Sequence, residues 1–122
     1  MKINLGVAAQ TPQFSKKMRR IRPAFELLFD DFSNIKLTNP IYDSILIGVT
    51  DSQSVDYFEE IKNREGYFQI LAGMSGDFSD EKAKELIFEI VKKSIQACPF
   101  SRPDKELLMR FLDEWKLKLF NT

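Results

Sequence analysis

The sequence predicts a single-domain α+β fold, in which an antiparallel or mixed sheet of about four strands carries three helices. Three observations support this fold class. Short segments alternate apolar with polar residues or contain β-branched runs, as strands do. Longer segments repeat apolar residues every three or four positions, as helices do. The length of 122 residues suits one domain spanning 1–122, because two smaller units would each lack a sufficient core.

The N-terminal part predicts a strand followed by a long helix. Residues 3–7 alternate apolar and polar or small side chains, which is the period of a half-buried strand. Thr11 and Pro12 are typical of an N-cap and a first helical position. One helical face then consists of Phe14, Met18, Ile21, Phe25, Leu28 and Phe32. Because this face keeps its phase across Pro23, one kinked helix is favoured over a helix broken there.

The middle of the chain predicts three strands. Residues 45–49 are compact and β-branched, which indicates a strand with most of both faces covered. Residues 55–62 fit either a strand or a short helix, since their apolar positions match both periods. The turn-forming residues 63–66 precede a clear strand at 67–74. A hairpin across 56–74 is therefore the economical interpretation.

The last third predicts two helices. Ser79 or Asp80 can cap the first, and Pro99 marks its end. Its apolar face is Ala83, Leu86, Ile87, Ile90, Val91, Ser94 and Ile95. The final helix, opening near Ser101, has the face Leu107, Leu108, Phe111, Leu112, Trp115 and Leu119. The order strand, helix, strand, hairpin, helix, helix suggests helices packed on one face of the sheet.

Composition indicates a cytoplasmic protein without a general attraction to polyanions. Lys plus Arg and Asp plus Glu each total 18, so the net charge is zero. Such a chain is not drawn as a whole to nucleic acid or anionic membrane. The single Cys98 cannot form an intrachain disulfide, and no apolar run is long enough for a membrane span. Cys98 ends an apolar helical face, so we expect it to be a buried, inert side chain.

The residue types argue against an enzyme. The chain contains no His, which removes the commonest general base and zinc ligand. It also lacks a CxxC pair and a glycine-rich phosphate loop. Its paired carboxylates are adjacent in sequence and therefore point in different directions. We predict no catalytic residues, no metal and no cofactor.

A basic block lies on the predicted first helix. It comprises Lys16, Lys17, Arg19, Arg20 and Arg22. Such a block could contact phosphates, which leaves a nucleic-acid-binding regulator as an alternative function. A solvated outer face is the favoured interpretation, because Met18 and Ile21 between these charges belong to the core face.

An acidic segment runs from Asp43 to Glu60 and contains no Lys or Arg. Its carboxylates could share one edge of the sheet and attract a basic protein partner. Neighbouring aromatic side chains could anchor the same interface. The predicted partner-binding residues are Asp43, Asp51, Asp56, Tyr57, Glu59 and Glu60.

Over most of its length the chain resembles small bacterial immunity proteins of polymorphic and contact-dependent toxin systems. The resemblance rests on the start of residues 1–6 leading into the charged helix 14–22, on the pair 57–65 and 67–71, and on the helix 83–95 before a final charged helix. It implies an α+β fold, cytoplasmic residence and non-covalent neutralisation of a cognate toxin domain, often a nuclease. A homo-oligomeric adaptor that associates through its sheet edge or the Trp115 helix is a further alternative.

Overall fold

The fold follows the predicted order of elements. The computed structural model describes residues 4–9, 11–38, 42–51, 54–61, 67–76 and 78–120, without the side chains of Gln13, Phe14 and Ile61. The elements are β1 (Asn4–Ala9), α1 (Pro12–Ser33), β2 (Ser44–Thr50), β3 (Phe58–Ile61), β4 (Tyr67–Gly73), α2 (Asp80–Ala97) and α3 (Arg102–Phe120). The predicted α+β class is confirmed. The predicted turn at 63–66 lies outside the described residues.

The four strands form one mixed sheet in the order β1-β2-β4-β3. β2 pairs in parallel with both β1 and β4, whereas β3 pairs antiparallel with β4. The short segment whose periodicity fitted both a strand and a helix is therefore the strand β3, and the predicted hairpin is confirmed. β1 and β3 are the two edge strands.

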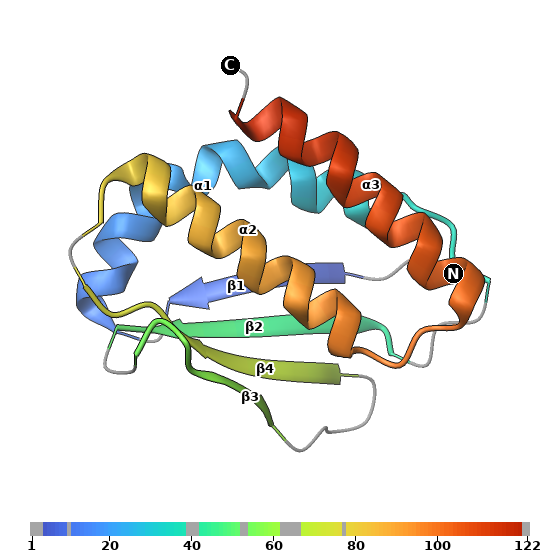
Figure 1. Cartoon of the computed structure of the whole chain (residues 1–122), viewed down its shortest axis with the longest axis horizontal. Coiled ribbons are helices and arrows are strands. Elements are labelled where there is room, and N and C mark those ends of the chain that lie inside the picture. The colour runs from blue at the N-terminus through green and yellow to red at the C-terminus, as the bar shows by residue number, and fades with distance from the viewer. Residues whose placement is uncertain are drawn as a thin grey trace.

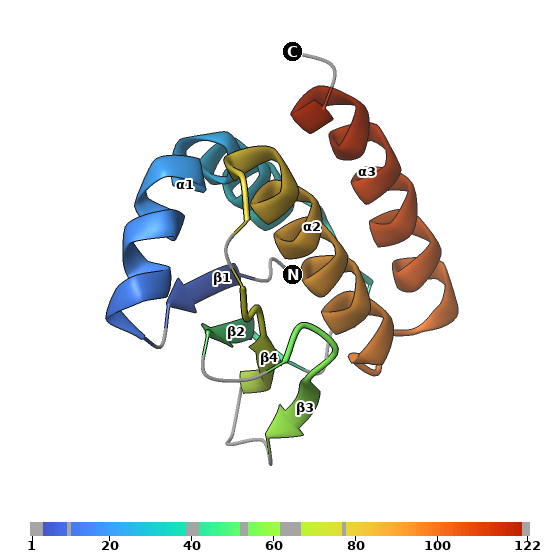
Figure 2. The ribbon, with the colours of Figure 1, turned by 60° about the vertical axis from the view of Figure 1, so that its left-hand side comes forward.

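All three helices lie on the same face of the sheet (Figures 1 and 2). α1 contacts β1, α2 contacts β2, and α3 contacts the other two helices. Strand residues that face the helices, such as Leu5, Ile47 and Ile70, are buried. Alternation along each strand sends the intervening side chains to the opposite face, which none of the described helices covers.

α1 is one helix that passes through Pro23, as the phase of its apolar face predicted. Its two halves run in different directions in both views of the ribbon, which is the expected consequence of an internal proline (Figures 1 and 2). Pro12 occupies the start of the helix as predicted. Thr11 is the N-cap residue, as predicted, with an extended backbone, although its side chain makes no capping hydrogen bond.

The two C-terminal helices confirm most of their predicted faces. Ser79 caps α2, because its hydroxyl accepts a hydrogen bond from the Lys82 backbone N–H. The exception lies on α3, where Leu107 is 38% exposed although it was predicted to face the core. Asp104 is buried instead, and its carboxylate accepts a hydrogen bond of 2.9 Å from the Thr38 backbone N–H. A buried Asp with a backbone donor was not foreseeable from apolar periodicity.

One prediction for β2 is wrong in a way that bears on function. The strand was expected to have most of both faces covered. Ile45, Ile47 and Val49 are buried, but Leu46 is 38% exposed and Gly48 is half-buried. Since every helix packs on one side, the alternate residues of this central strand face away from the core.

Candidate interaction surface

The helix-free side of the sheet is the most unusual surface of the molecule, and we call it the open face. Strand register places twelve described side-chain positions together on it: Asn4, Gly6, Ala8, Ser44, Leu46, Gly48, Thr50, Glu59, Tyr67, Gln69, Leu71 and Gly73. Glu59 is the only charged residue at the described strand positions of this side. A sheet face that is exposed only to water usually carries polar and charged side chains. A face with a single charged residue at its described strand positions is therefore atypical.

Small residues hollow the centre of the open face. A depression of about 410 Å³ lies over β1, β2 and β4. Gly6 and Ala8 on β1 and Gly48 on β2 leave room beside the leucines Leu46 and Leu71. A Cβ at Gly6 would lie 3.6 Å from the Leu46 side chain, which is ordinary contact distance. The absence of large side chains here therefore gives a shallow, apolar surface that another molecule can approach closely.

The predicted acidic residues do not form one patch. Asp43 precedes β2 and Asp51 follows it, so a seven-residue strand of roughly 23 Å separates them. Asp56 lies with Asp51 at the end of the sheet where β2 finishes and β3 approaches, since the Tyr57 carbonyl accepts a hydrogen bond from Gly73, the last residue of β4. The acidic segment is thus divided between the two ends of the sheet.

Glu59 and Glu60 occupy opposite faces of the edge strand β3. Glu59 pairs with Leu71 and shares the open face, whereas Glu60 pairs with Ile70 on the helix side. The Tyr57 hydroxyl donates a hydrogen bond to the Glu59 carboxylate. This bond, helped by partial burial and the negative charge of Glu59, raises the pKa of the Tyr57 phenol above its ordinary value. Tyr57 and Glu59 therefore form an acidic and aromatic margin of the open face, and Asp56 precedes them in the chain at the same end of the sheet.

Both edges of the sheet carry features that oppose the addition of another strand. β3 has only four residues, and two of them are glutamates. Next to β1, the Arg22 guanidinium lies against the strand and donates a hydrogen bond of 3.4 Å to the Val7 carbonyl. Short, charged or covered edges are the usual protection against edge-to-edge pairing. The open face is therefore a better candidate than either edge for contact with a partner.

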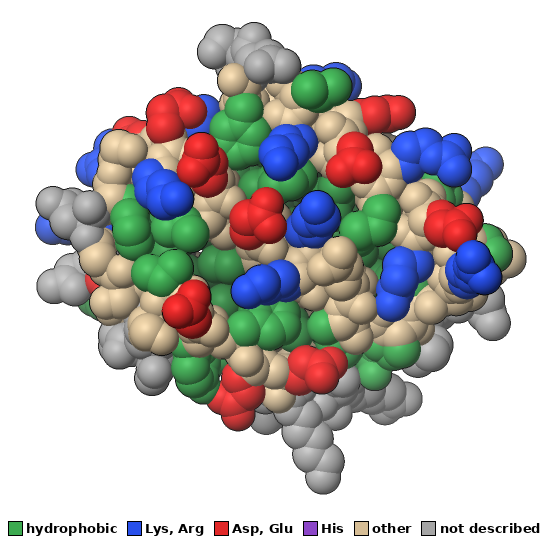
Figure 3. Space-filling view, viewed as in Figure 1, with side chains coloured by type: hydrophobic (Ala, Val, Ile, Leu, Met, Phe, Trp, Pro, Cys, Tyr) green, Lys and Arg blue, Asp and Glu red, His purple; other side chains and the backbone are tan. Residues whose placement is uncertain are grey.

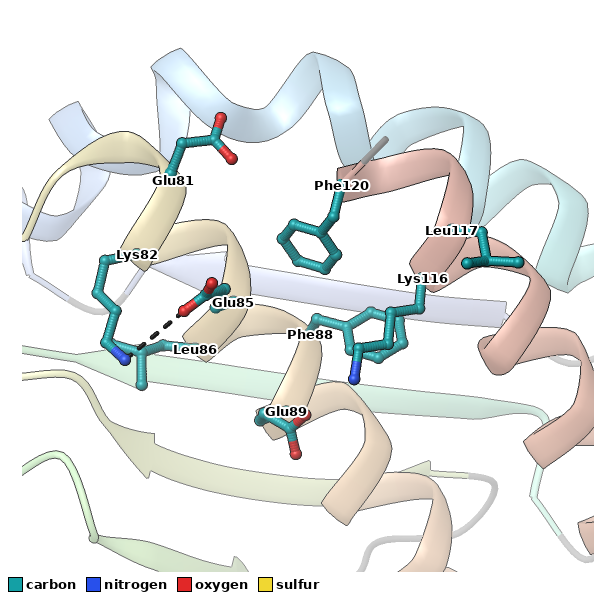
Figure 4. A pocket seen from close by; sticks show the side chains of 9 residues that line it. All are labelled: Glu81, Lys82, Glu85, Leu86, Phe88, Glu89, Lys116, Leu117 and Phe120. Carbon is teal, nitrogen blue, oxygen red and sulfur yellow. Dashed lines mark ion pairs between the residues drawn. The ribbon is translucent and has the colours of Figure 1, made fainter. Parts of the chain in front are cut away.

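The face formed by α2 and α3 has a different character. Figure 3 shows positive and negative side chains interspersed across it. A groove of about 540 Å³ runs between the two helices, with Phe88 and Phe120 at its base and charged side chains around it (Figure 4). These charges pair along α2 itself, Lys82 with Glu85 at 3.6 Å and Lys84 with Glu81 at 3.0 Å. Such local pairs are typical of a solvated helix surface.

Part of the basic block is engaged in the fold. Lys17 donates a hydrogen bond of 2.7 Å to the Gly76 carbonyl and lies over the Phe78 ring. Arg20 forms an ion pair of 3.1 Å with Asp80 at the start of α2. These two residues attach α1 to the segment that leads into α2. The basic block is therefore not one continuous surface for a phosphate backbone.

Cys98 is fully buried, as predicted. Burial raises the pKa of its thiol to about 12, against a smaller opposing effect of the Lys105 charge. Across the described ranges, no three Cys, Asp or Glu side chains gather as a metal site would require. No helix in the same part of the chain is long and apolar enough to cross a membrane.

We expect the Cys98 thiol to be unreactive in the folded protein, because the attacking species is the thiolate and a pKa of about 12 leaves almost none at neutral pH. A colorimetric thiol reagent should therefore modify the native protein far more slowly than the protein unfolded in guanidinium chloride. The folded thiol holds its proton more tightly than an ordinary cysteine of pKa 9.0. Raising the pH from 9.0 towards 12 should thus favour unfolding. Equal labelling rates in the two states would contradict this burial.

Comparison with known proteins identifies no relative. No protein-family model matches the chain, and no match was found among curated proteins or solved structures.

Proposed function

We propose that this protein is a cytoplasmic immunity protein that binds a cognate toxin domain non-covalently and neutralises it. The observation that carries the proposal is the open face, whose described strand positions hold a single charged residue and whose centre is a shallow apolar depression beside Leu46 and Leu71. Exposed apolar surface of this kind is the usual mark of a protein-binding site. The resemblance to immunity proteins supplies the class of partner.

The acidic margin supports a partner with a basic surface. Glu59 is exposed on the edge strand of the open face, Tyr57 donates a hydrogen bond to it, and Asp56 is exposed one residue before Tyr57. An interface with an apolar centre and a charged rim matches the general anatomy of protein complexes. Nuclease domains have basic surfaces because they bind a polyanion, so charge complementarity favours a toxin of that type.

The first experiment is a titration of this protein with the toxin domain encoded immediately upstream of its gene. The proposal predicts a stable one-to-one complex in which the toxin is inactive. If the purified toxin domain does not bind, the immunity function is rejected. Light scattering of the protein alone tests the adaptor alternative, which requires self-association.

Two charge-reversal variants test the acidic margin. The double variant Asp56→Lys, Glu59→Lys should raise the Kd for the toxin about tenfold or more, because attraction becomes repulsion beside the interface. The matched control is Glu60→Lys, since Glu60 is adjacent in sequence but faces the helix side. We expect its Kd to stay within about threefold of wild type. Equal losses in the two variants would reject the margin as the binding site while leaving the toxin as partner.

A further inference from the structure

Two arginines of the basic block, Arg19 and Arg22, line a hollow at the end of β1. This hollow of about 510 Å³ is lined by Ala8, Ala9, Ser15, Met18, Arg19 and Arg22. We call it the arginine hollow. Among the residues that the structure describes, this lining contains two guanidinium groups and one hydroxyl but no carboxylate. A volume of this size lies within the range of small-molecule sites.

Helical spacing brings the three polar residues together. Ser15, Arg19 and Arg22 follow one another at intervals of four and three, which places them on one side of α1. Lys17 and Arg20 lie on the other side of the helix, where they contact residues 76–80. Of the five cations on α1, Lys17 and Arg20 contact the segment before α2, Arg19 and Arg22 line the hollow, and Lys16 is exposed.

The two arginines are held differently. Arg22 is half-buried, and its hydrogen bond to the Val7 carbonyl fixes the guanidinium while leaving further N–H donors. Arg19 is exposed, and no hydrogen bond or ion pair joins it to any residue that the structure describes. Two positive side chains line one hollow that has no carboxylate among its described residues, so an anion in the hollow would be favoured.

The adjoining helix terminus also favours an anion. α1 begins directly after β1 and has no acidic residue in its first turn. Its N-cap residue, Thr11, makes no side-chain capping bond, and the buried Thr11 hydroxyl oxygen has no hydrogen-bond partner among the described residues. The positive end of the helix dipole therefore lies about one turn before Ser15, with no acidic residue in the first turn of the helix to compensate it.

We propose that the arginine hollow binds a single oxyanion group of the phosphate class, as free phosphate or on a small phosphate ester. Two guanidinium groups and a hydroxyl offer more hydrogen-bond donors than a carboxylate can accept. A phosphate has enough oxygens to accept hydrogen bonds from both guanidinium groups. A nucleic-acid backbone is disfavoured, because the neighbouring Lys17 and Arg20 are engaged and the net charge is zero. This site is independent of the proposed function.

The test is a titration of the full chain with inorganic phosphate, followed by the amide resonances and compared with potassium chloride at equal ionic strength. Phosphate should shift the amides of Ala8, Ala9 and Ser15 saturably, and chloride should not. The variant Arg19→Gln should raise the Kd for phosphate about tenfold or more. Lys16→Gln is the matched control, because Lys16 is exposed on the same helix and does not line the hollow.

Each other outcome overturns the site. If wild type shows no saturable shift, or if the two variants weaken phosphate binding equally, the arginine hollow is not a phosphate site. A parallel titration with a short DNA duplex distinguishes a site for a small phosphate from a site for a nucleic-acid backbone. If the duplex binds far more tightly than phosphate and Arg19→Gln abolishes its binding, the hollow is part of a nucleic-acid surface instead.

Discussion

Replacing Leu46 with lysine should weaken toxin binding about a hundredfold while leaving the protein folded. Leu46 lies on the central strand β2 and flanks the depression in the open face, together with the small residues Gly6 and Gly48. A lysine there would place a charge in the apolar centre of the interface, where it would lose its water without gaining a partner. The measurement is the Kd of the purified complex.

The matched control for this variant is Leu107→Lys on α3. Leu46 and Leu107 are each 38% exposed, so the two changes alter the surface of the free protein to a similar degree. Leu107 lies on α3, on the helical side of the molecule. The Kd of the Leu107→Lys variant for the toxin domain should therefore remain near that of wild type. Comparable weakening by both variants would show that the loss reflects a general effect of the new charge.

The largest effect on stability is expected from Phe25→Ala. Phe25 is fully buried near the middle of α1, and its ring stacks on Phe29 with centroids 6.1 Å apart. Removing a buried aromatic ring leaves a cavity and should lower the free energy of unfolding by about 3 to 5 kcal/mol. Denaturant unfolding followed by circular dichroism measures this change.

Leu27 provides the control on the same helix. Its side chain is 64% exposed, so Leu27→Ala should change the free energy of unfolding by no more than about 0.5 kcal/mol. If Phe25→Ala is too unstable to purify, Phe25→Leu should show a smaller loss in the same direction. Similar values for the variants at positions 25 and 27 would contradict the packing of α1 described above.

Periodicity predicted the elements well because each buried face leaves its own spacing in the sequence. The apolar stripe that includes Met18 and Phe25 continued in phase across Pro23, and the helix does the same. Alternation also placed Glu59 and Glu60 on different sides of a strand, as the hairpin now shows. These are local properties, so a single sequence carries them.

Tertiary arrangement was harder to predict because it depends on which elements share a face. The run that contains Leu46 looks like a strand covered on both sides, and only the position of all three helices on one side exposes it. Leu107 was expected to face the core and is partly exposed, whereas Asp104 is buried because its carboxylate accepts a hydrogen bond from the distant Thr38 backbone.

The candidate site was predicted only in part. The acidic residues are exposed or half-buried, but β2 separates Asp43 from Asp51. The open face was missed, because its defining feature is the lack of a covering helix. Gly6, Ala8 and Gly48 are small residues whose meaning appears only when register brings them together. An unusual number of small residues at alternate strand positions was the one available signal.

The most direct test of the central claim is a methyl NMR titration of the leucine-labelled protein with the upstream toxin domain. If the open face is the binding surface, the methyl groups of Leu46 and Leu71 should shift on complex formation, whereas those of Leu107 and Leu117 on α3 should not. Shifts confined to Leu107 and Leu117 would place the partner on the helical side and contradict the account.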